Sequence, residues 1–161
     1  MSRPTHNAVF DCVVYAQYLI NMHGPAAHCL QEVRRGFVHL FASSRIILEL
    51  QALPFKIPHQ YGVTIEDASQ LAEEIRKIGS IVDDAQPLYV HPIDSDDSEY
   101  INLALGTNSQ LIISRDKHLL NLMDVQRSDG RDFRKRFPQL IILSPDQFAR
   151  QLRDEERQDK P

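Results

Sequence analysis

The sequence predicts an α/β fold, a three-layer α/β/α sandwich around a central, mostly parallel sheet. Two observations predict it. Short apolar segments of strand length alternate, from one end of the chain to the other, with segments whose apolar residues recur at helical spacing. In addition, 161 residues suit one compact core and would be cramped for two. Because strands that alternate with helices are joined by crossovers, the sheet is expected to be parallel, with helices on both faces.

Five apolar segments are expected to be the strands. They are residues 7–11, 37–42, 88–90, 110–114 and 140–143. The first closes on Asp11, and its apolar run continues through Val13 to Val14 and Tyr15 and on toward Ile20. The charged stretch 124–136 is predicted to be an exposed loop.

The expected helices are recognised by their start signals. Pro25 is well placed to open a helix over 26–35, which Gly36 ends. Later helices start at capping residues, and a short one is expected over 118–123. The caps are Ser43-Ser44 for a helix that stops before Pro54, Thr64 with Asp67, Asp94 for a helix through Leu105, and Ser144 with Gln147.

These elements form one domain, which we place at residues 1–153. The remaining residues, 154–161, are all polar and are predicted to be a disordered C-terminal tail.

Composition and charge exclude several classes of protein. Apolar residues make up 42% and charged residues 25%, which is ordinary for a soluble globular chain. No apolar run approaches the length needed to cross a bilayer, and the start of the chain lacks a signal peptide, so a cytoplasmic protein is expected. Cys12 and Cys29 have no metal-binding spacing and are expected to be buried free thiols. The net charge of −4 argues against a protein that coats nucleic acid, but not against a nuclease.

Four acidic residues are expected at one edge of the sheet. In open parallel sheets, functional side chains gather just beyond the carboxyl ends of the strands. Asp11 ends the first strand and Asp116 follows the fourth. Asp97 lies in the first turn of the helix after the third strand, and Glu49 lies inside the helix after the second.

Four converging carboxylates require a positive partner, because they would otherwise repel one another. A hard divalent cation, Mg²⁺ or Mn²⁺, prefers oxygen ligands and supports water attack on phosphodiesters. The chain has no zinc-type set of cysteines and histidines, and none of its six glycines forms a phosphate-binding loop.

Each acid also has an ordinary structural explanation. Asp97 and Asp116 could simply cap helices, and Glu49 could be a solvated helix residue. Asp11 is harder to explain in this way, since an acid that closes a buried strand needs a partner. The joint pattern is more specific than any one member.

The order and context of these acids resemble a PIN domain of the kind found in prokaryotic toxin–antitoxin ribonucleases. The matching segments are Ala8–Asp11, Ser43–Leu50, Asp94–Ala104 and Leu111–Leu120, and the ending Leu140–Phe148 resembles one subgroup of toxin components. The resemblance covers roughly Asn7 to Leu152.

This resemblance implies a Mg²⁺- or Mn²⁺-dependent endoribonuclease that acts as the toxin of a toxin–antitoxin pair. Its metal-binding and catalytic acids would be Asp11, Glu49, Asp97 and Asp116, supported by Ser114, Asp94 and Asp96. The expected partners are an RNA substrate, an antitoxin protein and a second copy of the chain in a homodimer, without a membrane. The candidate RNA contacts around the acids are Arg45, Arg115 and Lys117.

One departure from the family pattern keeps a second interpretation open. After the first aspartate the family usually has a hydroxyl residue and then Asn or Ser, but this chain has Cys12 and Val13. Neither can supply the usual oxygen or amide contacts. The alternative is therefore a weakly active or inactive PIN-like module that acts through RNA or protein binding.

Two other catalytic arrangements have little support. The seven histidines have no triad context and are expected to be structural or exposed. A response-regulator receiver needs adjacent acids at its first strand and a lysine after its last, and this chain lacks both.

Overall fold

The computed structural model describes residues 2–161 and contains one five-stranded sheet in the order β3-β2-β1-β4-β5. Every neighbouring pair of strands is parallel, with His6 beside Val38 and Phe10 beside Ile113 in register. The strands are β1 (His6–Phe10), β2 (Val38–Ala42), β3 (Ser80–Ile81), β4 (Leu111–Ile113) and β5 (Ile141–Leu143). The predicted α/β class with a parallel sheet is confirmed.

Helices cover both faces of this sheet. The α-helices are α1 (Cys12–Ile20), α2 (Pro25–Arg34), α3 (Ser44–Gln51), α4 (Ile65–Ile78), α5 (Ser98–Gly106), α6 (Lys117–Leu120), α7 (Ser128–Arg136) and α8 (Pro145–Asp159). Short 3₁₀ turns are η1 (Leu53–Phe55), η2 (His59–Tyr61), η3 (Ser95–Asp97) and η4 (Asn121–Met123).

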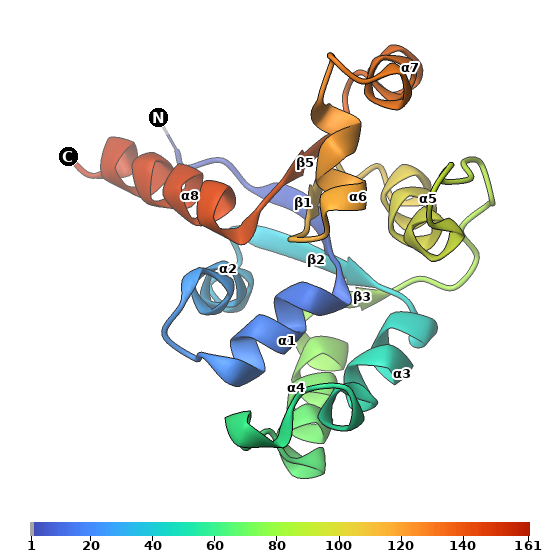
Figure 1. The fold of residues 1–161 in the computed structure, drawn as a ribbon. Helices are drawn as coiled ribbons and strands as arrows, with labels where there is room; N and C mark the ends of the chain where they lie inside the picture. Colours follow the sequence, from blue (N-terminus) through green and yellow to red (C-terminus); the bar gives the residue numbers. More distant parts are fainter. Residues whose placement is uncertain (1) are drawn as a thin grey trace.

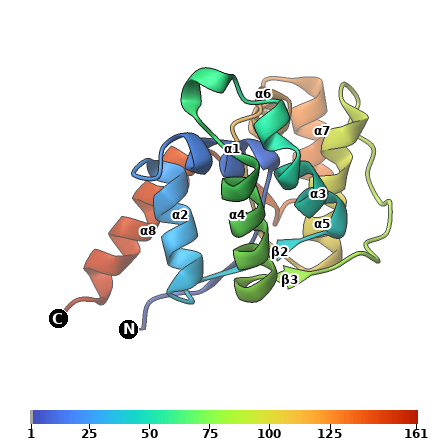
Figure 2. The same cartoon turned by 90° about the horizontal axis from the view of Figure 1, so that it is seen from below.

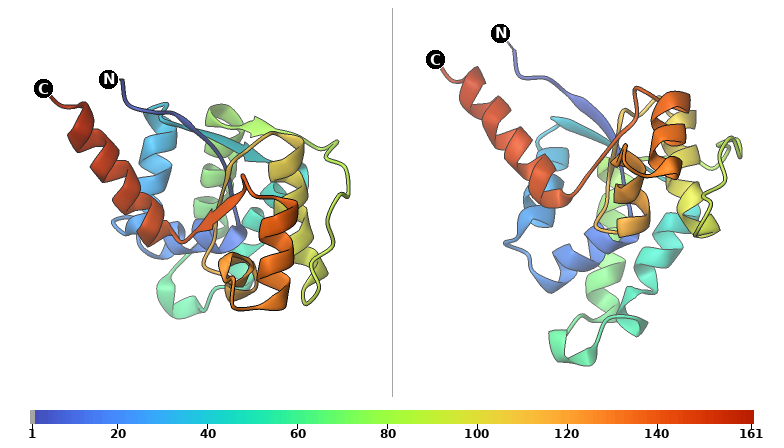
Figure 3. Two further views of the ribbon diagram at one scale, coloured as in Figure 1. Left: turned by 90° about the horizontal axis from the view of Figure 1, so that it is seen from above. Right: turned by 45° about the horizontal axis from the view of Figure 1, so that its top comes forward.

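These helices form the two outer layers of the sandwich. Helices α1 to α4 lie over one face (Figure 1 and Figure 2), and α5, α6 and α7 lie over the other (Figure 3). Helix α8 packs against α2. Because both faces are covered, Ala8, Val9 and Phe10 of β1 are all fully buried. Within residues 2–161, no helix is long and apolar enough to cross a lipid bilayer.

The strand order creates a crevice beside β1. The chain runs outward from β1 to β2 and β3, then returns across the sheet and places β4 on the other side of β1. The connections therefore diverge at the carboxyl ends of β1 and β4, which is where ligands bind in open parallel sheets. The backbone N–H of Asp11 donates to the carbonyl of Ile113 at 3.0 Å and holds these two strand ends together.

The capping signals that the sequence displays are used as predicted. Ser43 accepts a hydrogen bond from the N–H of Ile46 at the start of α3. Thr64 with Asp67 and Ser144 with Gln147 form complete capping boxes at α4 and α8. The helices that carry these signals accordingly begin where the sequence predicts them.

The residues after Asp11, which the sequence analysis treated only as a continued apolar run, form helix α1. The Asp11 side chain accepts a hydrogen bond from the N–H of Val14 and caps this helix. Val14 and Tyr15 are buried whereas Val13 and Ile20 are exposed, so apolar residues occupy both sides of α1. This distribution hides the helical period in the sequence.

The third strand is Ser80–Ile81, and the prediction of a strand at 88–90 is wrong. Gly79 lets the chain enter the sheet there, because a β-carbon at this position would lie 2.9 Å from the carbonyl oxygen of Leu40. At the predicted site, the side-chain amide of Asn102 pairs with the backbone of Tyr89, accepting from its N–H at 2.8 Å and donating to its carbonyl at 3.0 Å. The backbone polar groups of Tyr89 are thus satisfied without a neighbouring strand.

The stretch 124–136 is largely helical, contrary to the predicted exposed loop. Helix α7 buries Phe133, which packs edge-on against Tyr89 with ring centroids 5.3 Å apart. Gly130 faces the carbonyl of Asp124, where no β-carbon fits. Because few apolar residues mark the inner face of α7, its charged composition suggested a loop.

The C-terminal residues differ from the predicted disordered tail. Helix α8 continues through Asp159, so 154–159 are helical. Two of the polar side chains in this part are anchored across the fold. Glu155 lies 2.9 Å from Nε2 of His6, and Glu156 lies 3.2 Å from Nη1 of Arg35. The polar residues 154–159 are therefore the ion-paired end of a helix. Composition alone does not distinguish such an end from a disordered tail.

Candidate metal centre

Four side chains at the carboxyl edge of the sheet can direct one ligand atom each to a common point. They are Asp94, Asp97, Asp116 and His118, whose candidate ligand atoms all lie within 4.8 Å of one another. We call these four residues the acid cluster. Asp94 precedes η3, Asp97 ends it, and Asp116 caps α6, which contains His118. The cluster thus joins the crossover to α5 with the segment that follows β4.

Asp97 provides the clearest sign that the cluster suits a cation. Its side chain is buried, and Oδ2 has no hydrogen-bond partner among residues 2–161. Burial raises the pKa of Asp97 to about 6, and the neighbouring charges of Asp116 and Asp94 contribute to this rise. A buried carboxylate oxygen that faces other acids is costly unless a cation or a proton is present. Three carboxylates and an imidazole are ligands that fit a divalent ion.

Asp11 adjoins this cluster through Ser114. The Ser114 hydroxyl donates a hydrogen bond to Oδ2 of Asp11, and its oxygen accepts one from the N–H of Asp116 at 2.9 Å. Asp11 is only 2% exposed, and burial raises its pKa to about 7. The hydrogen bonds from Ser114 and Val14 lower this pKa, whereas the charges of Asp116 and Asp97 raise it. Asp11 is therefore electrostatically coupled to the cluster, although it is not one of its four members.

Glu49 occupies a separate position, on the side of Asp11 where α1 begins. Its Oε2 accepts hydrogen bonds from the hydroxyl of Tyr100 at 3.2 Å and the thiol of Cys12 at 3.3 Å. Its Oε1 lies 3.3 Å from Nε of Arg45. Burial raises the pKa of the Cys12 thiol well above its usual range, so this group remains a protonated donor.

Cys12 therefore has a contact that the sequence did not suggest. The expectation was that this residue could not replace the hydroxyl of the family pattern, yet its thiol donates to Glu49. Cys12 is a partly buried free thiol and Cys29 a buried one. The second departure, Val13, is 42% exposed, so this side chain is not part of the core.

The three predicted RNA contacts have different surroundings. Arg45 is close to three carboxylates, at 3.3 Å from Glu49, 3.4 Å from Glu99 and 3.5 Å from Asp96. This arrangement balances its charge and also places Asp96 outside the acid cluster. Arg115 and Lys117 are both exposed, and the nearest acid to Arg115 is Asp146, at 3.9 Å. Arg45 is therefore the most strongly paired of the three.

Two histidines that were expected to be structural or exposed belong to the site. His118 is a member of the acid cluster. His91 is 3% exposed and accepts hydrogen bonds at Nδ1 from the N–H groups of Ile93 and Asp94, at 3.1 Å each. Its Nε2 lies 2.8 Å from the carbonyl oxygen of His118 and must donate there, because Nδ1 is an acceptor. Through these hydrogen bonds, His91 links the segment that contains Asp94 with helix α6.

Of these two, only His118 had a signal in the sequence, its place two residues after Asp116 at a helix start. The sequence-predicted acids Asp97 and Asp116 do come together, joined by Asp94 from the supporting group.

Comparison with known protein families gives one match. A family model described as PIN domain matches residues 7–118, which is more than half of the chain. This segment includes β1, β2, β4 and all of the acids discussed above as site residues. PIN domains are typically metal-dependent nucleases. The search of curated proteins found no match to this chain.

Proposed function

This chain belongs to the PIN domain family, and from that premise we propose that it is a divalent-metal-dependent endoribonuclease that hydrolyses RNA phosphodiester bonds. The observation that carries this proposal is the unpartnered, buried Oδ2 of Asp97 within the acid cluster. The polar atoms of a helix cap on the surface form hydrogen bonds with the backbone or with water. This oxygen is instead buried without a partner, next to other acids.

The acid cluster is the proposed binding place for Mg²⁺ or Mn²⁺. When bound, such a cation would neutralise the carboxylates and the phosphate charge and would activate water for attack at phosphorus. Asp94, Asp97, Asp116 and His118 would hold it. Their positions are set by helix caps and by His91, so the donors are in place before the substrate arrives.

Asp11 and Glu49 complete the proposed catalytic set in different ways. Asp11 is held by Ser114 and adds a further buried carboxylate next to the cluster, where it would bind the cation. Glu49 is held by Tyr100 and Cys12, and its pairing with Arg45 orients this arginine at the edge of the site.

The biological part of the proposal follows the resemblance to toxin components. We propose that the chain acts in the cytoplasm as the toxin of a toxin–antitoxin pair, that it binds an antitoxin protein, and that it forms a homodimer. The toxin role, the antitoxin and the homodimer are supported by the resemblance alone, and the location by the composition of the chain.

The direct test is cleavage of single-stranded RNA with and without Mn²⁺. Wild-type protein should cleave only when the metal is present, and Asp97→Asn should lose most of this activity. Asp84→Asn, which changes an exposed acid outside the cluster, is the matched control and should retain it. Metal-independent cleavage, or equal cleavage by the wild type and Asp97→Asn, would contradict the proposed site.

A second candidate function is favoured by one observation, the valine at position 13. Without a polar side chain there, the chain could be a weakly active or inactive module that binds RNA or protein through the same fold. Wild-type protein that binds Mn²⁺ and RNA but shows no cleavage would support this alternative.

A further inference from the structure

Two adjoining hollows lie along the turn between α1 and α2. The first, of about 180 Å³, is lined by Gln17, Asn21, Gly24, Pro25, Ala26 and Arg115. The second, of about 450 Å³, shares Gly24 and Pro25 with the first. Arg115, which lines the first hollow, directly precedes Asp116 of the acid cluster in the chain.

Basic and amide side chains dominate both hollows. The second is lined by His23, His28, Gln31, Arg34 and Arg153, together with apolar residues. None of the residues that line either hollow in the described part of the chain is acidic. In a protein with a net charge of −4, such a run of positive and amide groups is a local exception that suits a polyanion.

The opposite side of the site has the reverse character. Around Arg45, three carboxylates outnumber the one positive charge. The hollow on that side, of about 290 Å³, is lined by Asp83 and Glu99 as well as by Arg45. The acids on the α3 and α5 side would therefore repel a phosphate chain, and Arg115 would attract it.

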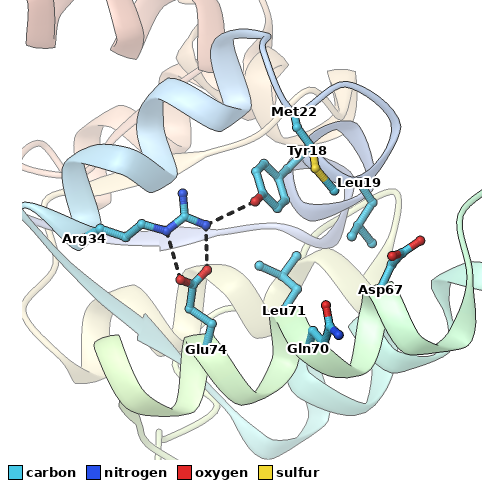
Figure 4. A pocket seen from close by; sticks show the side chains of 8 residues that line it. All are labelled: Tyr18, Leu19, Met22, Arg34, Asp67, Gln70, Leu71 and Glu74. Atoms are coloured by element: carbon cyan, nitrogen blue, oxygen red, sulfur yellow. Dashed lines mark hydrogen bonds and ion pairs between the residues drawn. The ribbon is translucent and has the colours of Figure 1, made fainter.

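The basic run also has a defined end. Arg34, which lines both the second hollow and the next pocket, forms two hydrogen bonds to Glu74, at 3.0 and 2.6 Å, and a third to the hydroxyl of Tyr18 at 3.2 Å (Figure 4). Figure 4 shows that Asp67 and Glu74 line the next pocket along this face. Arg34 is paired with Glu74, and acids line the next pocket. Of the other two arginines that line the hollows, Arg115 has only a long contact with Asp146, at 3.9 Å, and Arg153 has no salt bridge among the described residues. These two are the weakly paired cations of the hollows.

We propose that these two hollows form a track for single-stranded RNA, from Arg115 at the acid cluster to Arg153 on α8. This inference rests on the proposed nuclease function and names the substrate path of that site. Arg115 and Arg153 would contact phosphates, and the amides of Gln17, Asn21 and Gln31 would contact sugars or bases without strict sequence preference. A double helix is too stiff to follow two hollows around a turn, whereas a single strand can.

The test compares the affinity for a short and a long RNA in EDTA, where metal-dependent hydrolysis stops. Labelled single strands of about 4 and about 16 nucleotides span the range of sites on such proteins. The wild type should bind the long RNA more tightly. In Arg115→Gln/Arg153→Gln, the affinity for the long RNA should fall and the logarithmic salt slope should decrease by roughly 1.4, about 0.7 for each lost phosphate contact.

The control variant is Arg76→Gln, which removes an exposed arginine near the end of α4 that pairs with Glu73. An equal loss of affinity in this variant and the double variant would overturn the track, as would equal affinity of the wild type for the two RNA lengths. Equal affinity for a duplex would overturn the single-strand assignment. Cleavage of the short RNA with Mn²⁺ is measured separately. Its absence would contradict the nuclease proposal, while the length and salt effects would still decide the track.

Discussion

Ser114 donates a hydrogen bond from its hydroxyl to the carboxylate of Asp11, although the two residues are 103 positions apart in the chain. Ser114 follows β4 and Asp11 follows β1, so this bond closes the crevice between the two adjacent strands. The same hydroxyl oxygen accepts the N–H of Asp116. One small side chain thus fixes the relative positions of two acids that the sequence places far apart.

Metal binding should stabilise the fold through the acid cluster. A ligand that binds only the native state at about 100 times its dissociation constant adds roughly 2.7 kcal/mol. We therefore expect Mn²⁺ to raise the melting temperature of the wild type clearly and that of Asp97→Asn much less, because this variant lacks one buried ligand oxygen. The measurement is a thermal melt with and without Mn²⁺, with Asp84→Asn as the control. Equal shifts in the wild type and Asp97→Asn would rule out a shared site.

The stability of the metal-free protein should fall as the pH rises. Burial raises the pKa of Asp11 to about 7 from 3.8, so the folded chain holds a proton that the unfolded chain has already lost. Stability is therefore lost progressively as the pH rises from the unfolded to the folded pKa, by about 1.4 kcal/mol for each pH unit between these two values. Asp97, with a pKa of about 6, adds to the effect.

Thermal melts in EDTA at about pH 5 and about pH 8 measure this dependence. Asp11→Asn removes the carboxyl group with the larger of these two pKa rises. The melting temperature of this variant should therefore change less between the two pH values than that of the wild type. It should also equal or exceed that of the wild type at the higher pH. A wild-type protein that is more stable at the higher pH would contradict the raised pKa of Asp11.

Tyr100 should support Glu49 by hydrogen bonding. Its hydroxyl donates to Glu49 at 3.2 Å and accepts the N–H of Cys12 at 3.3 Å. Tyr100→Phe removes both bonds from a partly buried network and should lower the free energy of unfolding by about 1–2 kcal/mol. It should also reduce RNA cleavage. Urea unfolding and the Mn²⁺-dependent assay test this, with Tyr61→Phe as the control because Tyr61 is exposed. An unchanged Tyr100→Phe would show that Glu49 does not depend on this hydroxyl.

Replacing the valine at position 13 should be tolerated and should improve the site. Because Val13 is 42% exposed, Val13→Asn buries no amide and should change the free energy of unfolding by less than about 0.5 kcal/mol. An asparagine near the capping end of α1 can support an acid or a water molecule, which typically matters about 10–100-fold in metal affinity or activity. Mn²⁺ titration and cleavage assays of the two proteins provide the measurement. A stable Val13→Asn protein with no gain in either would favour the binding-module alternative.

Local signals in the sequence determined the class of fold and most of its helices. Proline, serine and threonine at helix starts act within one turn, so Pro25, Ser43, Thr64 and Ser144 can be interpreted without knowledge of the rest of the chain. Apolar segments long enough to fill a core marked four of the five strands. The rule that side chains gather beyond strand ends also identified Asp97 and Asp116 as neighbours.

Only the tertiary structure decided the remainder, because those features depend on contacts between distant segments. At Gly79 the chain passes close to the carbonyl of Leu40 as it enters the strand at Ser80, whereas the backbone of Tyr89 pairs with the side chain of Asn102 and not with a strand. Packing also places His118 in the acid cluster and places Glu49 within hydrogen-bond distance of Tyr100 and Cys12. Residue types and spacings state which groups could bind a cation, but the distances between their oxygen atoms are set by how β1, β4 and the crossover pack together.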